Sequence, residues 1–222
     1  MLKLEHIFKS YDKPLFENFN LEIEENSITC ILGGSGVGKT TLLKMIAGLI
    51  DYKGKIDCPS KVAFIFQDDR LIPSLTVRDN LKLTSPNKCD KEIEELLKIL
   101  GLVNVMDRYP KSLSGGEAKR VAMARAFLYD GDVILMDEAF SSLDLNLKLK
   151  LIGYFADLWN KNKKTVIFVT HDIDEAMLLA QKILILKDGQ IISSFDLNSN
   201  LPRKVDDNFE VRSKIIEDLL NQ

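Results

Sequence analysis

Gly33-Gly34-Ser35-Gly36-Val37-Gly38-Lys39-Thr40 is the stretch that decides the fold of this 222-residue chain. It fits the pattern GxxxxGK[ST] and lies between an apolar segment, residues 27–32, and residues 39–50, where apolar side chains recur at helical spacing. Glycines let successive backbone N–H groups converge on phosphate oxygens, and the start of a helix adds the positive end of its dipole. The sequence therefore predicts a phosphate-binding loop between a strand and a helix.

The last residues of this loop indicate which phosphate compound it binds. In such a loop the lysine, here Lys39, reaches the β and γ oxygens, and the hydroxyl of Thr40 binds Mg²⁺. We therefore expect a nucleoside triphosphate with Mg²⁺, held by Thr41 as well as by residues 33–40. A plain glycine turn is the alternative, and the strand and helix on its two sides disfavour it.

A second apolar strand, residues 133–136, ends in two acidic residues, Asp137 and Glu138. Charge at the end of a buried strand is costly unless a positive group lies near it. Mg²⁺ on the nucleotide would be that group, so we expect Asp137 to hold the ion. Glu138 would orient and deprotonate the water that attacks the γ-phosphate. An acidic exit from the strand without a role is the alternative.

The composition is that of an ordinary globular protein, with 30 Lys and Arg against 33 Asp and Glu, a net charge of −3, and 45% hydrophobic residues. Its apolar runs are far shorter than the roughly 18 residues that cross a bilayer, and the N-terminus lacks the apolar core of a signal peptide. We therefore expect a cytoplasmic protein. The lack of a basic stripe argues against nucleic acid as a partner. We interpret Cys30, Cys58 and Cys89, which are widely spaced, as packing thiols.

The order of the expected elements indicates an α/β fold. We predict a P-loop NTPase core with a mostly parallel sheet, an N-terminal antiparallel β subdomain and an inserted α-helical subdomain. Residues 1–222 would form a single domain, with the helical subdomain at about 70–130. The expected strands are 2–8, 15–24, 27–32, 54–58, 62–66, 133–136, 165–169, 183–186 and 191–193, and the expected helices are 39–50, 76–83, 90–100 and 114–129. A last helix, from about 208 to 220, would dock through Val211, Ile215, Ile216, Leu219 and Leu220.

Leu113-Ser114-Gly115-Gly116-Glu117 stands at the start of the helix expected at 114–129. Ser114 and Glu117 have the spacing of a capping box, so a well-capped helix is the plain interpretation. The motif follows a phosphate loop and precedes the acidic strand, and in that order it resembles the signature of ATP-binding cassette (ABC) ATPases. In that family the serine and glycines approach the γ-phosphate of a nucleotide on the opposite subunit. The resemblance implies that Ser114, Gly115, Gly116 and Glu117 bind ATP across a head-to-tail dimer.

The resemblance extends in family order over nearly the whole chain. Gln67 matches the loop glutamine that touches Mg²⁺ and the attacking water, and His171 matches the switch histidine at the γ-phosphate. Asp144, in Ser141-Ser142-Leu143-Asp144, matches a residue that crosses the dimer interface. Tyr11, 22 residues before Gly33, matches the aromatic that stacks on adenine. A capping histidine and a packing tyrosine are the plainer alternatives.

Two positions depart from the commonest family pattern. Glu117 stands where many members carry Gln, and Ala139 follows Glu138 where Pro is usual. Neither change removes a group that the chemistry requires. Because Glu117 adds a negative charge near the partner's triphosphate, we hypothesise that nucleotide binding depends more tightly on Mg²⁺.

The resemblance also implies partners. An ATPase of this kind drives a separate transmembrane permease subunit, pairs with a second cassette, most simply an identical copy, and serves an extracytoplasmic substrate-binding protein indirectly. It would be peripheral at the inner face of the cell membrane. Residues 66–80 place apolar Leu71, Ile72 and Leu75 among charges, as a docking surface or as a subdomain core.

The same stretch, with Phe140, looks most like the importer cassettes for nitrate, sulfonate, taurine or thiamine-precursor uptake. Three alternatives differ from that reading. They are an exporter or lipoprotein-release cassette, a soluble cassette ATPase that acts on nucleic acid or the ribosome, and a P-loop small-molecule kinase. The kinase would have no use for the Ser114–Glu117 motif or for His171.

Overall fold

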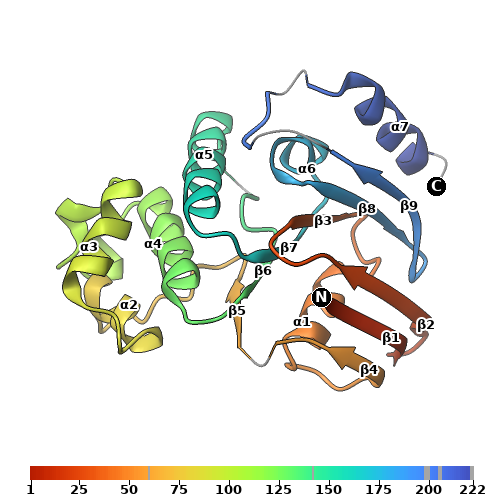
Figure 1. Cartoon of the computed structure of the whole chain (residues 1–222), viewed down its shortest axis with the longest axis horizontal. Helices are drawn as coiled ribbons and strands as arrows, with labels where there is room; N and C mark the ends of the chain where they lie inside the picture. Colours follow the sequence, from red (N-terminus) through yellow and green to blue (C-terminus); the bar gives the residue numbers. More distant parts are fainter. Residues whose placement is uncertain (60, 142, 198–200, 205–206, 221–222) are drawn as a thin grey trace.

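A six-stranded sheet forms the centre of the computed structural model, which describes residues 1–59, 61–141, 143–197, 201–204 and 207–220 (Figure 1). Neighbouring strands are parallel except for the last pair, β8 and β9, which is antiparallel. In spatial order the strands are β5 (Val62–Ile65), β6 (Val133–Asp137), β7 (Thr165–Thr170), β3 (Ile28–Leu32), β8 (Lys182–Lys187) and β9 (Gln190–Asp196). This is the mostly parallel sheet that the sequence predicts.

The central strands are buried on both faces, as their continuous apolar sequences require. Successive side chains of a strand point to opposite faces, so each strand contributes to two cores. On β3, Cys30 and Leu32 belong to one core, and Ile31 belongs to the other. A sheet of this kind needs a layer of structure on each side.

Helices α5 (Leu145–Lys161), α6 (Ile173–Leu179) and α7 (Phe209–Leu220) cover one face of the sheet. The other face packs against α1 (Lys39–Ile46) and against a separate antiparallel sheet with the order β2-β1-β4. The strands of that sheet are β1 (Leu2–Ser10), β2 (Pro14–Ile23) and β4 (Lys53–Asp57). The predicted N-terminal antiparallel part is therefore present.

A group of helices lies at one end of the molecule, beyond β5 (Figure 1). It consists of α2 (Val77–Thr84), α3 (Asp90–Ile99) and α4 (Gly115–Leu128), with two 3₁₀ turns, Val103–Val105 and Pro110–Ser112. Both α2 and α3 pack against α4, and α4 also contacts β5 and α5. These helices form the inserted helical part that the sequence predicts. The limits of about 70 and 130 stay a prediction.

Helix α1 is shorter than predicted, because it ends at Ile46 and not at residue 50. Gly48 takes φ +66°, and its N–H donates to the carbonyl of Met45. The N–H of Leu49 donates to the carbonyl of Lys44 at 2.9 Å. This pair of bonds closes the helix in a Schellman motif, which leaves Leu49 exposed.

The prediction of packing thiols is wrong for Cys89. Cys30 is buried and Cys58 is half-buried, but Cys89 is exposed at the N-terminal cap of α3. Cys89 is the N-cap residue of α3, and its backbone N–H, which has no acceptor within the helix, donates to the Glu92 carboxylate at 2.9 Å. A position at a helix start therefore overrides the usual burial of cysteine.

The C-terminal helix docks through three of the five predicted residues, because Ile216 and Leu220 are not among the described side chains that pack on the core. Ile215 is buried, and Val211 and Leu219 pack on the same core, whereas Leu220 is 77% exposed. Val211, Ile215 and Leu219 are spaced by four and share one face of α7, which turns Leu220 away from the sheet. None of the described helices is long and apolar enough to cross a membrane.

Candidate active site

The phosphate loop is built on two glycines for which no other residue can substitute. A Cβ atom on Gly33 would lie 2.5 Å from the carbonyl oxygen of Leu186, on the neighbouring strand β8. Gly38, the N-cap of α1, takes φ +103°, where L-residues are strained. The loop can therefore follow this path between β3 and α1 only with glycine at both places.

Lys39 turns its ammonium group back into the loop. Nζ donates hydrogen bonds to the carbonyl oxygens of Gly33 at 2.9 Å and Gly34 at 2.7 Å. Burial lowers the pKa of Lys39, and the carboxylates of Glu138 and Asp137 oppose that shift. A cation thus stands inside the loop, next to two acidic residues and within reach of any phosphate that the loop would hold.

Thr40 and Asp137 come together as the sequence predicts. The Thr40 hydroxyl donates to Asp137 Oδ1 at 2.8 Å, which joins the first turn of α1 to the end of β6. Burial raises the pKa of Asp137, and the hydrogen bond from Thr40 partly offsets the shift. A hydroxyl and a carboxylate oxygen are the hard donors that Mg²⁺ prefers, so the pair fits this ion.

Glu138 and His171 form a second pair beside the first. His171 Nδ1 lies 3.2 Å from Glu138 Oε1, and each residue directly follows a strand, β6 or β7. Glu138 takes φ +45°, a left-handed backbone that is costly for a non-glycine residue. Its N–H donates to the carbonyl of Val169 at 3.1 Å, which fixes the turn.

A pocket of about 330 Å³ brings Lys39, Thr40 and Glu138 together with Tyr11, whereas Asp137 and His171 are not among the described residues that line it. Tyr11 lies in the turn between β1 and β2 and is 62% exposed, with the Lys9 ammonium 5.1 Å from its ring centroid. Val37 instead packs toward the core beneath the loop. The lining residues are Tyr11, Leu15, Ser35, Gly36, Gly38, Lys39, Thr40, Thr41 and Glu138.

The predicted signature residues lie at the start of α4, and none of them is among the described residues that line this pocket. The Glu117 carboxylate accepts hydrogen bonds from the backbone N–H of Ser114 at 2.7 Å and from its hydroxyl at 2.8 Å. These bonds hold the pKa of Glu117 below its usual value. A Cβ on Gly116 would lie 2.8 Å from Leu147 of α5. The capping-box interpretation is confirmed within the chain.

Two further predicted residues also lie outside the pocket lining. Gln67 is exposed, and its backbone carbonyl accepts a hydrogen bond from the Lys119 ammonium. The Asp144 carboxylate caps α5 by accepting from the N–H of Leu147 at 3.0 Å. Gly115 stands beside Ser114 in the first turn of α4. Ser142 lies outside the described residues.

The sequence reasoning missed one group of residues next to the site. Lys148 on α5 forms ion pairs with Asp172 and Glu175, which stand at the start of α6 directly after His171. It also missed Leu15, which lines the pocket. No local spacing signals this cluster, because Lys148 and its two partners lie on different helices and more than twenty positions apart.

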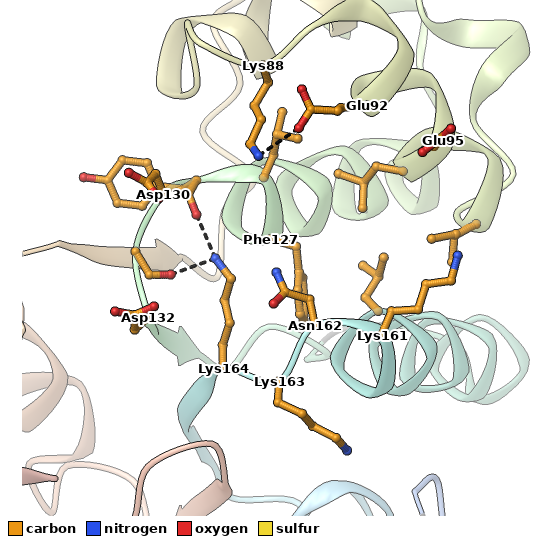
Figure 2. A pocket seen from close by; sticks show the side chains of 16 residues that line it. Lys88, Glu92, Glu95, Phe127, Asp130, Asp132, Lys161, Asn162, Lys163 and Lys164 are labelled. Carbon is orange, nitrogen blue, oxygen red and sulfur yellow. Dashed lines mark hydrogen bonds and ion pairs between the residues drawn. The ribbon is translucent and has the colours of Figure 1, made fainter.

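A larger cavity, of about 500 Å³, lies elsewhere in the fold (Figure 2). It is lined by residues of α3, by the segment 127–132 that leads into β6, and by the end of α5. Lys164 donates to the carbonyl oxygens of Tyr129 and Gly131, both at 2.7 Å. Because β6 enters the sheet here and reaches Asp137 at its other end, this cavity is separate from the phosphate pocket.

A phosphate loop, a Thr–Asp pair and a Glu–His pair in a mostly parallel α/β fold define a P-loop nucleoside triphosphatase. The protein-family model described as "ABC transporter" matches residues 16–141. The chain belongs to the ABC transporter family and is an ATP-binding cassette with ATPase activity.

Curated relatives agree with this assignment. The aliphatic sulfonates import ATP-binding protein SsuB 3 of Nocardia farcinica is 39% identical over 197 residues, which cover 88% of this chain and 80% of that protein. The oligosaccharides import ATP-binding protein MsmX of Bacillus subtilis is 40% identical over 210 residues. That match covers 86% of this chain and 58% of MsmX.

Solved structures share the fold. The dimeric structure of MJ0796, described as a bacterial ABC transporter cassette, has a TM-score of 0.77 and 30% identity, and the match covers 90% of this chain and all of that one. The same cassette is known in a post-hydrolysis state bound to ADP and Pi. CbiO1 of Clostridium perfringens, part of the ABC transporter complex cbiONQ, has a TM-score of 0.79 and 26% identity and covers 99% of this chain.

Proposed function

We propose that this chain is the ATP-hydrolysing subunit of an ABC importer, with Glu138 as the general base and His171 as its partner at the γ-phosphate. The observation that carries the assignment is the 3.2 Å approach of His171 to Glu138 beside a pocket that the phosphate loop lines. No other carboxylate among the described pocket residues stands next to both the loop and a histidine.

The loop residues bind and orient the nucleotide. Lys39 exchanges the carbonyl oxygens of Gly33 and Gly34 for the β and γ oxygens, and the N–H groups of residues 33–41 direct the phosphates. Tyr11, exposed at the rim of the pocket, offers its ring to adenine. Thr40 and Asp137, with Gln67, would hold Mg²⁺, which neutralises charge on the phosphates as the bond breaks.

Glu138 then takes a proton from the attacking water, and its carboxylate is placed for this by the left-handed turn after β6. His171 donates to a γ-phosphate oxygen, and its contact with Glu138 keeps the two side chains on the same side of the pocket. Both residues directly follow neighbouring parallel strands, β6 and β7, so the sheet fixes their backbone positions.

The second half of the site would come from another copy. In the head-to-tail arrangement, Ser114, Gly115, Gly116 and Glu117 of one chain face the nucleotide of its partner, and Asp144 lies at the interface. Two features support this: Ser114 and Gly115 are exposed at the N-terminal end of α4, and MJ0796, which is similar to this chain, has a dimeric structure. A symmetric pair is the simplest assembly, because each chain carries both halves.

The work of hydrolysis would be delivered to a transmembrane permease subunit, with an extracytoplasmic substrate-binding protein acting through it. The cassette would then be cytoplasmic and peripheral at the inner face of the cell membrane. SsuB 3 and MsmX are import proteins by name, which favours import over export, lipoprotein release or work on nucleic acid. In the predicted contact segment, residues 66–80, Leu71 packs against the core and Ile72 is exposed. Leu71 therefore belongs to the core, and Ile72 is available for docking.

A co-purification experiment tests the transport assignment. Tagged Glu138→Gln chain, which should hold Mg-ATP without hydrolysing it, is added to detergent-solubilised native membranes, and mass spectrometry identifies what it retains. We expect a multi-span membrane protein in the presence of Mg-ATP. The double variant Glu138→Gln with Ser114→Arg, which should not close into a dimer, serves as the matched control. Recovery of ribosomal or nucleic-acid proteins alone would contradict the proposal.

A further inference from the structure

One lysine joins two elements of the site that are far apart in the sequence. Lys148 Nζ lies 2.6 Å from Asp172 Oδ2 and 2.9 Å from Glu175 Oε1. The side chain of Lys148 is 16% exposed and that of Glu175 is 2% exposed. This is a largely buried ion cluster between α5 and α6.

The hydrogen bonds around the cluster are well satisfied. The Thr170 hydroxyl donates to Glu175 Oε2 at 2.7 Å and accepts from the N–H of Asp172 at 3.0 Å. Asp172 Oδ1 in turn accepts from the N–H groups of Asp174 and Glu175, which caps α6. Because a buried carboxylate is costly without such partners, these bonds favour the observed path of the chain between β7 and α6.

That segment carries His171. Asp172 follows it directly, and His171 Nδ1 stands 3.2 Å from Glu138 Oε1. At the other end, Lys148 lies one helical turn after Asp144, whose carboxylate caps α5. The ammonium group is therefore one of the direct links between the first turn of α5 and the turn that presents His171.

We infer that Lys148 is a positioning residue that fixes the place of His171 relative to the start of α5. The ammonium group holds Asp172, the neighbour of His171, and through it the placement of the His171–Glu138 pair. The inference rests on the proposed function, because it takes Glu138 and His171 as the groups that act on ATP. A merely structural ion pair would stabilise the fold without setting the rate of hydrolysis.

Four variants test this in the full chain. Lys148→Met removes the ammonium group, and Lys148→Arg keeps a cation. The double variant Lys148→Met with Glu175→Gln removes the buried charge that the first change leaves unpaired. Lys150→Met changes an exposed lysine of the same helix and serves as the control. For each variant, ATPase kcat and KM, nucleotide affinity and the melting temperature are measured.

We expect kcat to fall about tenfold in Lys148→Met, because a displacement of only about 1 Å can cost about 10²-fold and the loss of one positioning contact should move His171 by less. The KM and the nucleotide affinity should stay near those of the unchanged chain. Lys148→Arg should restore most of kcat, and Lys150→Met should match the unchanged chain. The double variant should regain the melting temperature while kcat stays low.

The inference is overturned if the double variant regains both melting temperature and kcat, or if Lys148→Met hydrolyses ATP at the normal rate. An unchanged kcat in Glu138→Gln would instead overturn the proposed function, and this inference with it. The Glu138→Gln measurement therefore separates the two failures.

Discussion

The phosphate loop and the start of α4 are both glycine-rich segments that open a helix, yet they treat an anion differently. In the loop, a buried lysine supplies positive charge and binds the carbonyl oxygens of Gly33 and Gly34. At the start of α4, the outward N–H group of Ser114 is already bonded to the carboxylate of Glu117. In the proposed site, the loop is prepared for a phosphate bound by its own chain. In the proposed dimer, the start of α4 would have to release the Glu117 carboxylate before it could receive the partner's phosphate.

The largest effect should come from Glu138→Gln, which leaves the phosphate loop intact and removes only the base. Turnover should fall by about 10² or more, the usual scale for a general base, while ATP affinity is kept. Steady-state phosphate release and equilibrium nucleotide binding measure the two quantities. Weak binding in this variant would contradict the assigned role.

Ser114→Arg changes only the start of α4. The change removes the hydroxyl and places a long side chain where the partner's nucleotide would approach, so turnover should fall about tenfold or more. Nucleotide binding by the single chain should be unchanged, because Ser114 is not among the described residues that line the pocket. Normal hydrolysis by this variant would sink the head-to-tail arrangement.

Lys39→Ala changes only the phosphate loop. It removes the charge that pairs with the β and γ oxygens, and a hydrogen bond to a charged group contributes about 1.5–3 kcal/mol. Nucleotide affinity should therefore drop roughly tenfold or more, as measured by titration calorimetry. Affinity equal to that of the unchanged chain would show that the loop binds without its lysine. Lys44, near the end of the same helix, provides a matched Ala control.

Glu117→Gln should give the smallest change, and it sharpens the comparison directly. A neutral amide accepts less strongly from Ser114 and adds no negative charge beside the partner's triphosphate. We expect nucleotide affinity to depend less on Mg²⁺ in this variant than in the unchanged chain, by a few-fold. The hypothesis is wrong if titrations with and without Mg²⁺ agree for the two proteins.

Much of this site could be predicted because its signals are local in the sequence. The loop, the acidic end of β6 and the capping box each occupy fewer than ten consecutive residues, and the structure places Thr40 beside Asp137 and His171 beside Glu138. Parallel strands bring their carboxyl ends to one edge, which is why these distant segments meet.

The errors have a different origin. Helix α1 ends early because Gly48 takes a left-handed backbone conformation. A glycine within an apolar helical pattern does not by itself predict that conformation. Exposure of Cys89 and Leu220 depends on which way a helix faces its neighbours. The Lys148 cluster joins residues more than twenty positions apart, and no spacing in a single sequence reveals a pairing between two helices.

The left-handed backbone conformation of Glu138 lowers the stability of the fold, whereas the proposed hydrolysis of ATP requires the carboxylate of this residue. Glycine would adopt φ +45° without the cost of about 1 kcal/mol that a side chain adds there. A chain optimised for folding alone would thus carry glycine at position 138, and under the proposed role of Glu138 it would not hydrolyse ATP. Screens that select variants of this cassette for thermal stability alone are therefore expected to enrich glycine at position 138 and to lose ATPase activity. Screens that also select for ATP hydrolysis should keep Glu138.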